Sequence, residues 1–218
     1  MRFFRILSAP SAVVAALTFA PGAFAAALAP GATLGALTDN AGTVTTLITS
    51  QSSVVGSFGS IPSSGTLISA VYHDSGGGLD FVYEYIVSTG DIGSLSPATF
   101  SGFTTDVGAI TTFVGGEAAQ FSPFTDGGIG PTTTSRVSGA GSAIDFHWSP
   151  ANTTKTAILI VKTNATTFQT SAVGIIEGVP TSAPGYTPAP EPAQAGLLLG
   201  GIFAAGLFVA RKFRVQRS

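Results

Sequence analysis

The clearest structural signal in this chain is the segment Leu79-Asp80-Phe81-Val82-Tyr83-Glu84-Tyr85-Ile86-Val87. Its odd-numbered positions are all apolar or aromatic, whereas its even-numbered positions alternate between acidic and aliphatic residues. Because successive side chains of a β-strand point to opposite faces, this period of two predicts a strand whose aromatic face lies on a core. We expect the acidic residues to belong to a solvated surface, as most charged residues do.

Similar residues continue on both sides of this stretch. Ser142–Trp148 repeats the alternation, and the continuous apolar run Ala157–Val161 predicts a central strand buried on both faces. Further strands are expected at Val44–Thr49, Ser53–Phe58, Thr66–Tyr72, Thr99–Phe103, Val107–Val114, Ser135–Val137 and Thr167–Ile176. Many short strands with glycine-rich turns between them predict an all-β fold, a β-sandwich, with jelly-roll and immunoglobulin-like arrangements both left open.

The charge of the chain is unevenly distributed. Between Ala26 and Pro190 there are ten acidic and three basic residues, a net charge of about −7, and the other six basic residues lie near the two termini. Nucleic acids and anionic membrane surfaces both require clustered Lys and Arg, so neither is expected as a partner of this acidic body. The chain has no cysteine, which excludes a disulfide framework and a thiolate site.

The N-terminus has the organisation of a secretory signal peptide. Two arginines precede the stretch 6–24, which is almost wholly apolar or small, and two prolines there disfavour the alternative of a retained membrane anchor. Ala23 and Ala25 form a small-x-small cleavage site, with Ala25-Ala26-Ala27 as a nearby alternative. We therefore expect export through the secretion translocon, with a mature chain that begins near Ala26.

The C-terminus has the pattern of a membrane span followed by a basic stop. Ala195–Ala210 is an uncharged run of 16 residues, about 24 Å long as a helix. A helix that begins at Pro192 comes closer to the roughly 20 residues that a bilayer core requires. Four basic residues follow and predict a cytoplasmic end: Arg211, Lys212, Arg214 and Arg217. A buried core helix is the alternative, but such helices are rarely Gly-rich and followed at once by a basic terminus.

Five prolines lie between the body and this span: Pro180, Pro184, Pro188, Pro190 and Pro192. They predict an extended stalk, and they block helix formation before residue 192. We therefore divide the chain into a signal peptide (1–25), a β-sandwich ectodomain (26–178), a Pro-rich stalk (179–191), a single transmembrane helix (192–210) and a basic cytoplasmic tail (211–218).

Pro190-Glu191-Pro192, followed by a glycine-rich apolar helix and a basic end, resembles the PEP-CTERM sorting signal of Gram-negative bacteria. Ala189 stands where the usual motif has Val. The resemblance implies that a membrane-embedded processing enzyme, the exosortase, is a partner and that the membrane holds the chain before processing. It further implies delivery to the cell surface or extracellular matrix, beside exopolysaccharide. Leu79–Tyr83 is similar to a strand that recurs in the bodies of such proteins, and that similarity implies no activity.

The residues of the body indicate no catalytic site, metal site or cofactor. His73 and His147 each lie near an acid, Asp74 and Asp145, but nothing in the sequence brings the two histidines together. A Gly-x-Ser-x-Gly nucleophile motif is absent from the sequence. The segment 74–80 could hold Ca²⁺ through loop oxygens, although a plain glycine turn explains it better.

These observations predict a non-enzymatic, exported protein with a structural or adhesive role beside exopolysaccharide. The alternative is a surface-displayed carbohydrate-binding module that stacks sugars on exposed rings, for which the candidates are Tyr72, Tyr83, Tyr85 and Trp148. A hydrolase is the third hypothesis, and it requires His73 and His147 to lie together with an acid in a cleft.

Overall fold

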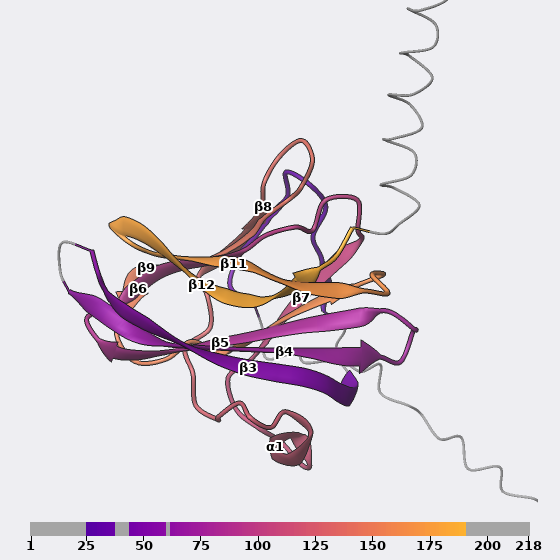
Figure 1. Ribbon diagram of the computed structural model, residues 1–218, viewed down its shortest axis with the longest axis horizontal. Helices are drawn as coiled ribbons and strands as arrows, with labels where there is room; N and C mark the ends of the chain where they lie inside the picture. Colours follow the sequence, from indigo (N-terminus) through magenta and orange to yellow (C-terminus); the bar gives the residue numbers. More distant parts are fainter. Residues whose placement is uncertain (1–24, 38–43, 60–61, 191–218) are drawn as a thin grey trace, which may run out of the picture.

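The computed structural model describes residues 25–37, 44–59 and 62–190. Within these residues the chain forms two six-stranded antiparallel sheets, which lie face to face as two layers (Figure 1). The expected all-β fold with two packed sheets is therefore confirmed. The predicted signal peptide, transmembrane helix and basic tail lie outside the described residues, apart from Ala25.

The first layer, sheet A, has the strand order β1-β7-β10-β5-β4-β3. In that order its strands are Ala26–Ala27, Thr105–Ile110, Ile158–Thr163, Leu79–Thr89, Ser63–Asp74 and Val44–Phe58. The three strands β3, β4 and β5 form a meander in which each strand pairs with the next. Strand β10 lies between β5 and β7 and is almost wholly buried, as its continuous apolar run predicts.

The second layer, sheet B, has the strand order β12-β11-β6-β9-β8-β2. In that order its strands are Val179–Pro188, Phe168–Glu177, Ile92–Pro97, Ile144–Asn152, Thr133–Arg136 and Thr33–Leu34. The chain crosses from one sheet to the other after β1, β2, β5, β6, α1, β9 and β10, so strands distant in sequence meet in both layers. The one-turn helix α1 (Glu117–Gln120) lies on the outer side of sheet A (Figure 1).

The hydrophobic core lies between the two sheets. The alternation of β5 directs Phe81, Tyr83 and Tyr85 into it, and all three side chains are 0% exposed. They belong to one cluster with Leu95 and Phe146 of sheet B. The segment that predicted the fold, Leu79–Val87, thus contributes its aromatic face to the core between the sheets.

The other face of β5 is also covered, and our expectation of a solvated acidic surface is wrong for Asp80 and Glu84. Both residues are 0% exposed. The segment 111–128 folds back over sheet A, where Phe121 and Phe124 join a second hydrophobic cluster. Thr125 donates two hydrogen bonds to the Glu84 carboxylate, of 3.2 Å from its N–H and 2.9 Å from its hydroxyl. Burial nevertheless raises the pKa of Glu84, because desolvation outweighs these bonds.

A buried arginine closes the side of the sandwich where the two shortest strands lie. Arg136 is 3% exposed, and all five N–H groups of its guanidinium donate hydrogen bonds to Leu28, Phe100, Phe103, Thr105 and Gly141. Four of these acceptors are backbone carbonyls. Burial lowers the pKa of Arg136. The bond to Leu28 fixes the segment that joins β1 at the edge of sheet A to β2 at the edge of sheet B.

Several predicted strand boundaries are wrong for identifiable reasons. Val44–Thr49 and Ser53–Phe58 form one strand, because the polar residues between them continue the ladder with β4. Thr99–Phe103 is a turn in which Thr99 has a φ of 68° and the Phe103 N–H bonds to the Phe100 carbonyl. Strands β6 and β12 were not expected.

The predicted stalk is the largest correction to our division of the chain. Val179–Pro188 is strand β12, which pairs with β11 over its whole length and extends the sandwich ten residues beyond the expected end at 178. All three of its prolines, Pro180, Pro184 and Pro188, occupy even-numbered positions. The N–H of Tyr186, another even position, points away from β11 and donates to the Ser69 hydroxyl at 2.9 Å. The prolines therefore remove no ladder hydrogen bond, as proline at an edge strand requires.

Candidate functional site

The predicted sorting motif begins where the described chain ends. Pro190 is exposed and is the last described residue, whereas Glu191, Pro192 and the four basic residues after them lie outside the described ranges. Ala189 donates its N–H to the Thr167 carbonyl at 3.1 Å, so the chain stays anchored to the sandwich until one residue before the motif. Among the described residues, no helix has the length and apolar character needed to cross a membrane.

The predicted signal cleavage site adjoins the first strand. Ala23 lies outside the described residues, whereas Ala25 is buried, and Ala26 and Ala27 pair with Val107 and Asp106 of β7. Cleavage after Ala25 would leave β1 intact. Cleavage at the alternative site, after Ala27, would remove β1 and expose the edge of β7.

The four rings suggested as a sugar-stacking platform are core residues. Tyr72, Tyr83 and Tyr85 are 0% exposed and Trp148 is 2% exposed. Tyr83 donates its hydroxyl to the Tyr186 carbonyl at 2.5 Å, and the Trp148 indole donates to a backbone carbonyl at 3.0 Å. A ring can stack on a sugar only if one of its faces is open, so these four rings cannot form such a platform.

The two histidines lie in different sheets, His73 on β4 and His147 on β9. His147 Nδ1 lies 3.0 Å from the Ser94 hydroxyl on the neighbouring strand β6. The acid nearest in sequence, Asp145, accepts instead from the Ser96 hydroxyl at 2.5 Å. A serine nucleophile needs a base that an acid orients, and these bonds form two separate pairs on the sheet surface rather than such a relay.

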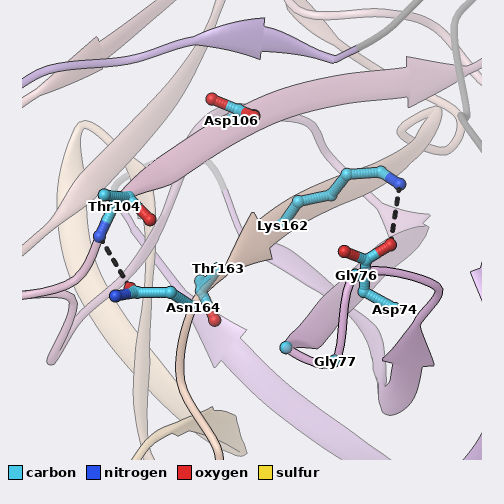
Figure 2. A pocket seen from close by; sticks show the side chains of 9 residues that line it. Asp74, Gly76, Gly77, Thr104, Asp106, Lys162, Thr163 and Asn164 are labelled. Carbon is cyan, nitrogen blue, oxygen red and sulfur yellow. Dashed lines mark hydrogen bonds and ion pairs between the residues drawn. The ribbon is translucent and has the colours of Figure 1, made fainter.

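Among the described residues, a cavity lined by several charged groups lies at one end of sheet A (Figure 2). It has a volume of about 310 Å³, and we call it the Lys162 pocket; it is lined by Asp74, Gly76, Gly77, Gly78, Thr104, Asp106, Lys162, Thr163 and Asn164. These residues come from the β4–β5 turn, from the start of β7 and from the end of β10. Every lining side chain is polar, since the remaining residues are glycines.

The turn that forms one wall of the Lys162 pocket follows directly from its sequence. Asp74 donates its N–H to the Gly78 carbonyl at 3.0 Å, and Gly77 adopts a φ of +90°, which favours glycine. A Cβ atom at Gly78 would lie 2.0 Å from the Thr163 carbonyl oxygen. Glycine is therefore required where the turn approaches β10, and the sequence-based preference for a glycine turn at 74–80 agrees with this geometry.

The electrostatics of the pocket centre on one ammonium group. Lys162 pairs with Asp80 on one neighbouring strand and with Asp106 on the other. Its Nζ lies 3.7 Å from Asp74 Oδ1 and 3.7 Å from Asp80 Oδ2, and Figure 2 shows it reaching toward Asp74. Both oxygens of Asp80 are buried without a hydrogen bond, and burial raises its pKa to about 7 despite the lysine. At the other end of the pocket, the Asn164 side chain accepts from the Thr104 N–H at 2.9 Å.

This arrangement suits a neutral, hydroxyl-rich ligand better than an ion. Carboxylates accept hydrogen bonds from the hydroxyl groups of such a ligand. An ammonium or an amide group donates hydrogen bonds to the oxygen atoms of the same hydroxyl groups. The position that a cation would occupy beside Asp74 and Asp80 is already taken by the Lys162 ammonium. Within the described ranges, no group of three or more His, Cys, Asp or Glu residues is placed to hold a metal ion.

Sequence reasoning identified Asp74 and its glycine turn but not Lys162, Asp106 or Asn164 as parts of one site. Their meeting depends on strand order, because β10 inserts between β5 and β7. The available signal was that Lys162 and Asp106 directly adjoin two predicted strands, Ala157–Val161 and Val107–Val114, but the sequence does not reveal which strands are neighbours.

No family model, curated protein or solved structure matches this chain.

Proposed function

We propose that this chain is an exported cell-surface or extracellular-matrix protein with a structural or adhesive role beside exopolysaccharide, sorted through its C-terminal signal. The observation that carries the proposal is the ordered C-terminal sequence: Pro-Glu-Pro at 190–192, an uncharged apolar run and four basic residues. Such a segment partitions into a bilayer as a helix, and its basic end resists translocation. The signal peptide at 1–25 supplies the complementary export signal.

The end of the sandwich supports recognition close to the membrane surface. Among the described residues, Ala189 is the last with a hydrogen bond to the sandwich, and the proposed membrane helix begins at Pro192. The few residues between these points span about 10 Å at most when extended. The sandwich would therefore rest nearly on the membrane before processing, and Glu191 would be the only charge that the processing enzyme meets between the sandwich and the basic end.

The composition of the sandwich surface agrees with a polysaccharide-rich surrounding. The body carries a net charge of about −7, which keeps it soluble and away from anionic surfaces. Since the four candidate rings are buried, a polysaccharide contact would use hydrogen-bonding groups rather than ring stacking. The Lys162 pocket offers carboxylate acceptors on Asp74 and Asp106, an ammonium donor and a volume of about 310 Å³. We therefore assign the alternative function, carbohydrate binding, to this pocket.

Intact-mass measurement on the protein exported by its native host tests the sorting proposal. We expect an N-terminus at Ala26 and a C-terminus shortened near residues 190–192. Glu191→Ala should abolish this processing and leave the protein in the membrane fraction. Glu117→Ala, on α1, is the matched control and should be processed normally. Unchanged processing of the Glu191→Ala protein would contradict recognition of the motif.

Retention in the matrix tests the adhesive role separately. Asp106 is exposed in the Lys162 pocket, so Asp106→Ala should lower the fraction of exported protein that sediments with extracellular polysaccharide while processing stays normal. Glu117→Ala again serves as the control. Equal sedimentation of both variants and the unmodified protein would remove the pocket from the proposal and leave the sorting signal unaffected.

A further inference from the structure

The edge of sheet A formed by β3 is long and lacks the residues that usually block pairing with a further strand, so we call it the bare edge. Strand β3 runs over 15 residues, Val44–Phe58, and contains no proline and no charged residue. Among the described residues, only β4 pairs with it. An edge strand presents a row of backbone N–H and C=O groups that can pair with a further strand, and proteins usually block such edges with charges, prolines or short strands.

The other three sheet edges are protected in these ways. Two end in the two-residue strands β1 and β2. The third is β12, whose prolines lack the outward N–H groups that a further strand would need. The Pro184 carbonyl of β12 is also occupied, because the Ser53 hydroxyl donates to it at 3.0 Å. The protection of three edges makes the bare surface of β3 a specific property of that strand.

The sequence of β3 is chemically symmetric about Gln51. Outward from this residue, hydroxyl residues come first on both sides and aliphatic residues come next, in the order Leu47-Ile48-Thr49-Ser50-Gln51-Ser52-Ser53-Val54-Val55. Two antiparallel copies related by a two-fold axis at Gln51 would place Ser50 opposite Ser52, Thr49 opposite Ser53 and aliphatic residues opposite each other. A two-fold interface requires such self-complementarity.

The geometry of β3 is most regular at the centre of this symmetric sequence. From Thr49 to Val55 the register with β4 advances residue by residue, and the irregularities lie before Thr49 and after Val55. Val54 is 86% exposed, and Leu47 and Ile48 are 40% and 38% exposed. These aliphatic side chains would meet their counterparts in the paired copy, where burial of apolar surface favours association.

The amide of Gln51 supplies a separate observation at the same position. Its Nε2 atom is buried and has no hydrogen-bond acceptor among the described residues. An unsatisfied buried donor is unfavourable. In the antiparallel pair the two Gln51 side chains would lie directly opposite each other, and cross-strand neighbours are close enough for their amides to bond.

From these features we infer that two copies of this chain associate through β3, antiparallel and with Gln51 opposite Gln51, so that their two A sheets join into one continuous sheet. The partner is a second copy rather than an unrelated extended peptide, because the sequence of the edge complements itself. The strand carries no charge, so the negative charge of the two bodies stays away from the seam. The inference is independent of the sorting proposal.

Single-cysteine variants of the full-length chain, exported by its native host, test this register, since the chain has no cysteine of its own. Under mild oxidation Gln51→Cys should form a disulfide-linked dimer, because the two positions face each other. Val54→Cys should not, because its two copies would lie about 20 Å apart along the seam at about 3.4 Å per residue. Val54 is the more exposed position, so random collision predicts the opposite order. Linkage of Val54→Cys alone, or no linkage of Gln51→Cys, would overturn the inference.

Charged substitutions in β3 provide a second test of the pairing, which holds even if a cysteine at the seam alters the contact between the two copies. Ser50 and Ser52 are exposed, so lysine or glutamate should be tolerated at both positions in the isolated sandwich. The double variant Ser50→Lys and Ser52→Lys places like charges opposite each other and should weaken self-association about tenfold. Mixing it with the variant Ser50→Glu and Ser52→Glu should restore association between the two tagged chains. Equal self-association of all variants would contradict pairing through β3, and Trp148 fluorescence verifies that each variant is folded.

Discussion

Strands β3 and β12 are the two long edge strands of this molecule, and they lie on the same side of the sandwich. Both are rich in Ser, Thr and small residues, and both exceed the usual strand length. β12 carries three prolines and is tied to the opposite layer, whereas β3 has no proline and no charge. Similar composition therefore produces one closed edge and one open edge, according to whether prolines are present and where they fall in the register.

The closure of β12 is made by side chains of sheet A. The hydroxyls of Ser53 and Ser69 and the phenol of Tyr83 bond to backbone groups of β12 that point away from β11. Thr49 and Tyr186 add a bond of 3.2 Å between their hydroxyls. β3 contributes to this closure with its inward side chains, while its own outer backbone edge receives no strand among the described residues. The same strand therefore protects one edge and exposes another.

Removal of Arg136 should produce the largest effect, because it opens the opposite side of the sandwich. Arg136→Met removes the guanidinium donor from four backbone carbonyls, of which those of Leu28 and Phe100 keep a second donor and those of Phe103 and Gly141 lose the bond from Arg136 without that replacement. We expect a loss of about 4 kcal/mol in the free energy of unfolding. Thermal unfolding of the exported protein, followed by Trp148 fluorescence, measures it. Lys155→Met, which removes the surface bonds of Lys155 to Thr125 and Asp126, should cost much less. An equal cost for both would contradict the role assigned to Arg136.

Proline placement in β12 gives the next largest effect and tests the parity argument directly. Ala183 occupies an odd position, where the N–H points toward β11, so Ala183→Pro should remove a ladder bond and cost about 3 kcal/mol. Ser182 occupies an even position, and Ser182→Pro should change stability by less than about 1 kcal/mol. Chemical denaturation of both variants makes the comparison. Similar costs would show that the register does not explain why β12 tolerates proline.

The stability of the protein, measured over a series of pH values, tests a buried residue of sheet A rather than either edge strand. Because the pKa of Asp80 is raised from its usual 3.8 to about 7, the folded state binds this proton more tightly than the unfolded state does. The contribution of Asp80 to stability is therefore complete below about pH 4 and is lost as the pH rises through about 7. Asp80→Asn should be more stable than the unmodified protein at pH 8, by about 1–3 kcal/mol, and the difference should vanish near pH 4.

One further measurement controls the pH series. Self-association should be unaffected between pH 5 and 8, since β3 contains no titratable residue. A profile for Asp80→Asn that parallels the unmodified protein would contradict the assignment of the buried carboxyl.

Loss of one phenol should have the smallest effect and loosen only the closed edge. Tyr83→Phe removes the hydroxyl that bonds to the Tyr186 carbonyl, and we expect a cost of about 1 kcal/mol together with faster hydrogen exchange in β12. Tyr85→Phe is the matched control, because the buried hydroxyl of Tyr85 has no hydrogen-bond partner among the described residues. It should be neutral or stabilising. If Tyr85→Phe were the more harmful change, the closure of β12 would not depend on Tyr83.

The sequence predicted the fold where alternation and burial agree. The aromatic face of Leu79–Val87 and the apolar run of β10 both occupy the positions expected of them. The acidic face of β5 was misjudged, because its cover is the segment 111–128, whose position depends on tertiary packing. The prolines were interpreted as a stalk because proline locally favours an extended backbone. Only the register with β11 reveals that Pro180, Pro184 and Pro188 suit an edge strand.

The candidate site was less predictable than the fold. A glycine turn at Asp74–Gly78 could be inferred from local sequence, but Lys162 and Asp106 join it only through the order of the strands. The same limit applies to the bare edge. The sequence of β3 shows its symmetry, whereas its position at the end of sheet A is a property of the whole topology.

Hydrogen exchange of the exported chain, measured over a range of protein concentrations, tests most directly whether the molecule has one closed and one open edge. Backbone amides between Thr49 and Val55 should become more protected as concentration rises, while protection of β12 should stay constant. Protection in β3 that does not depend on concentration, or protection that rises equally in both strands, would contradict an open edge at β3.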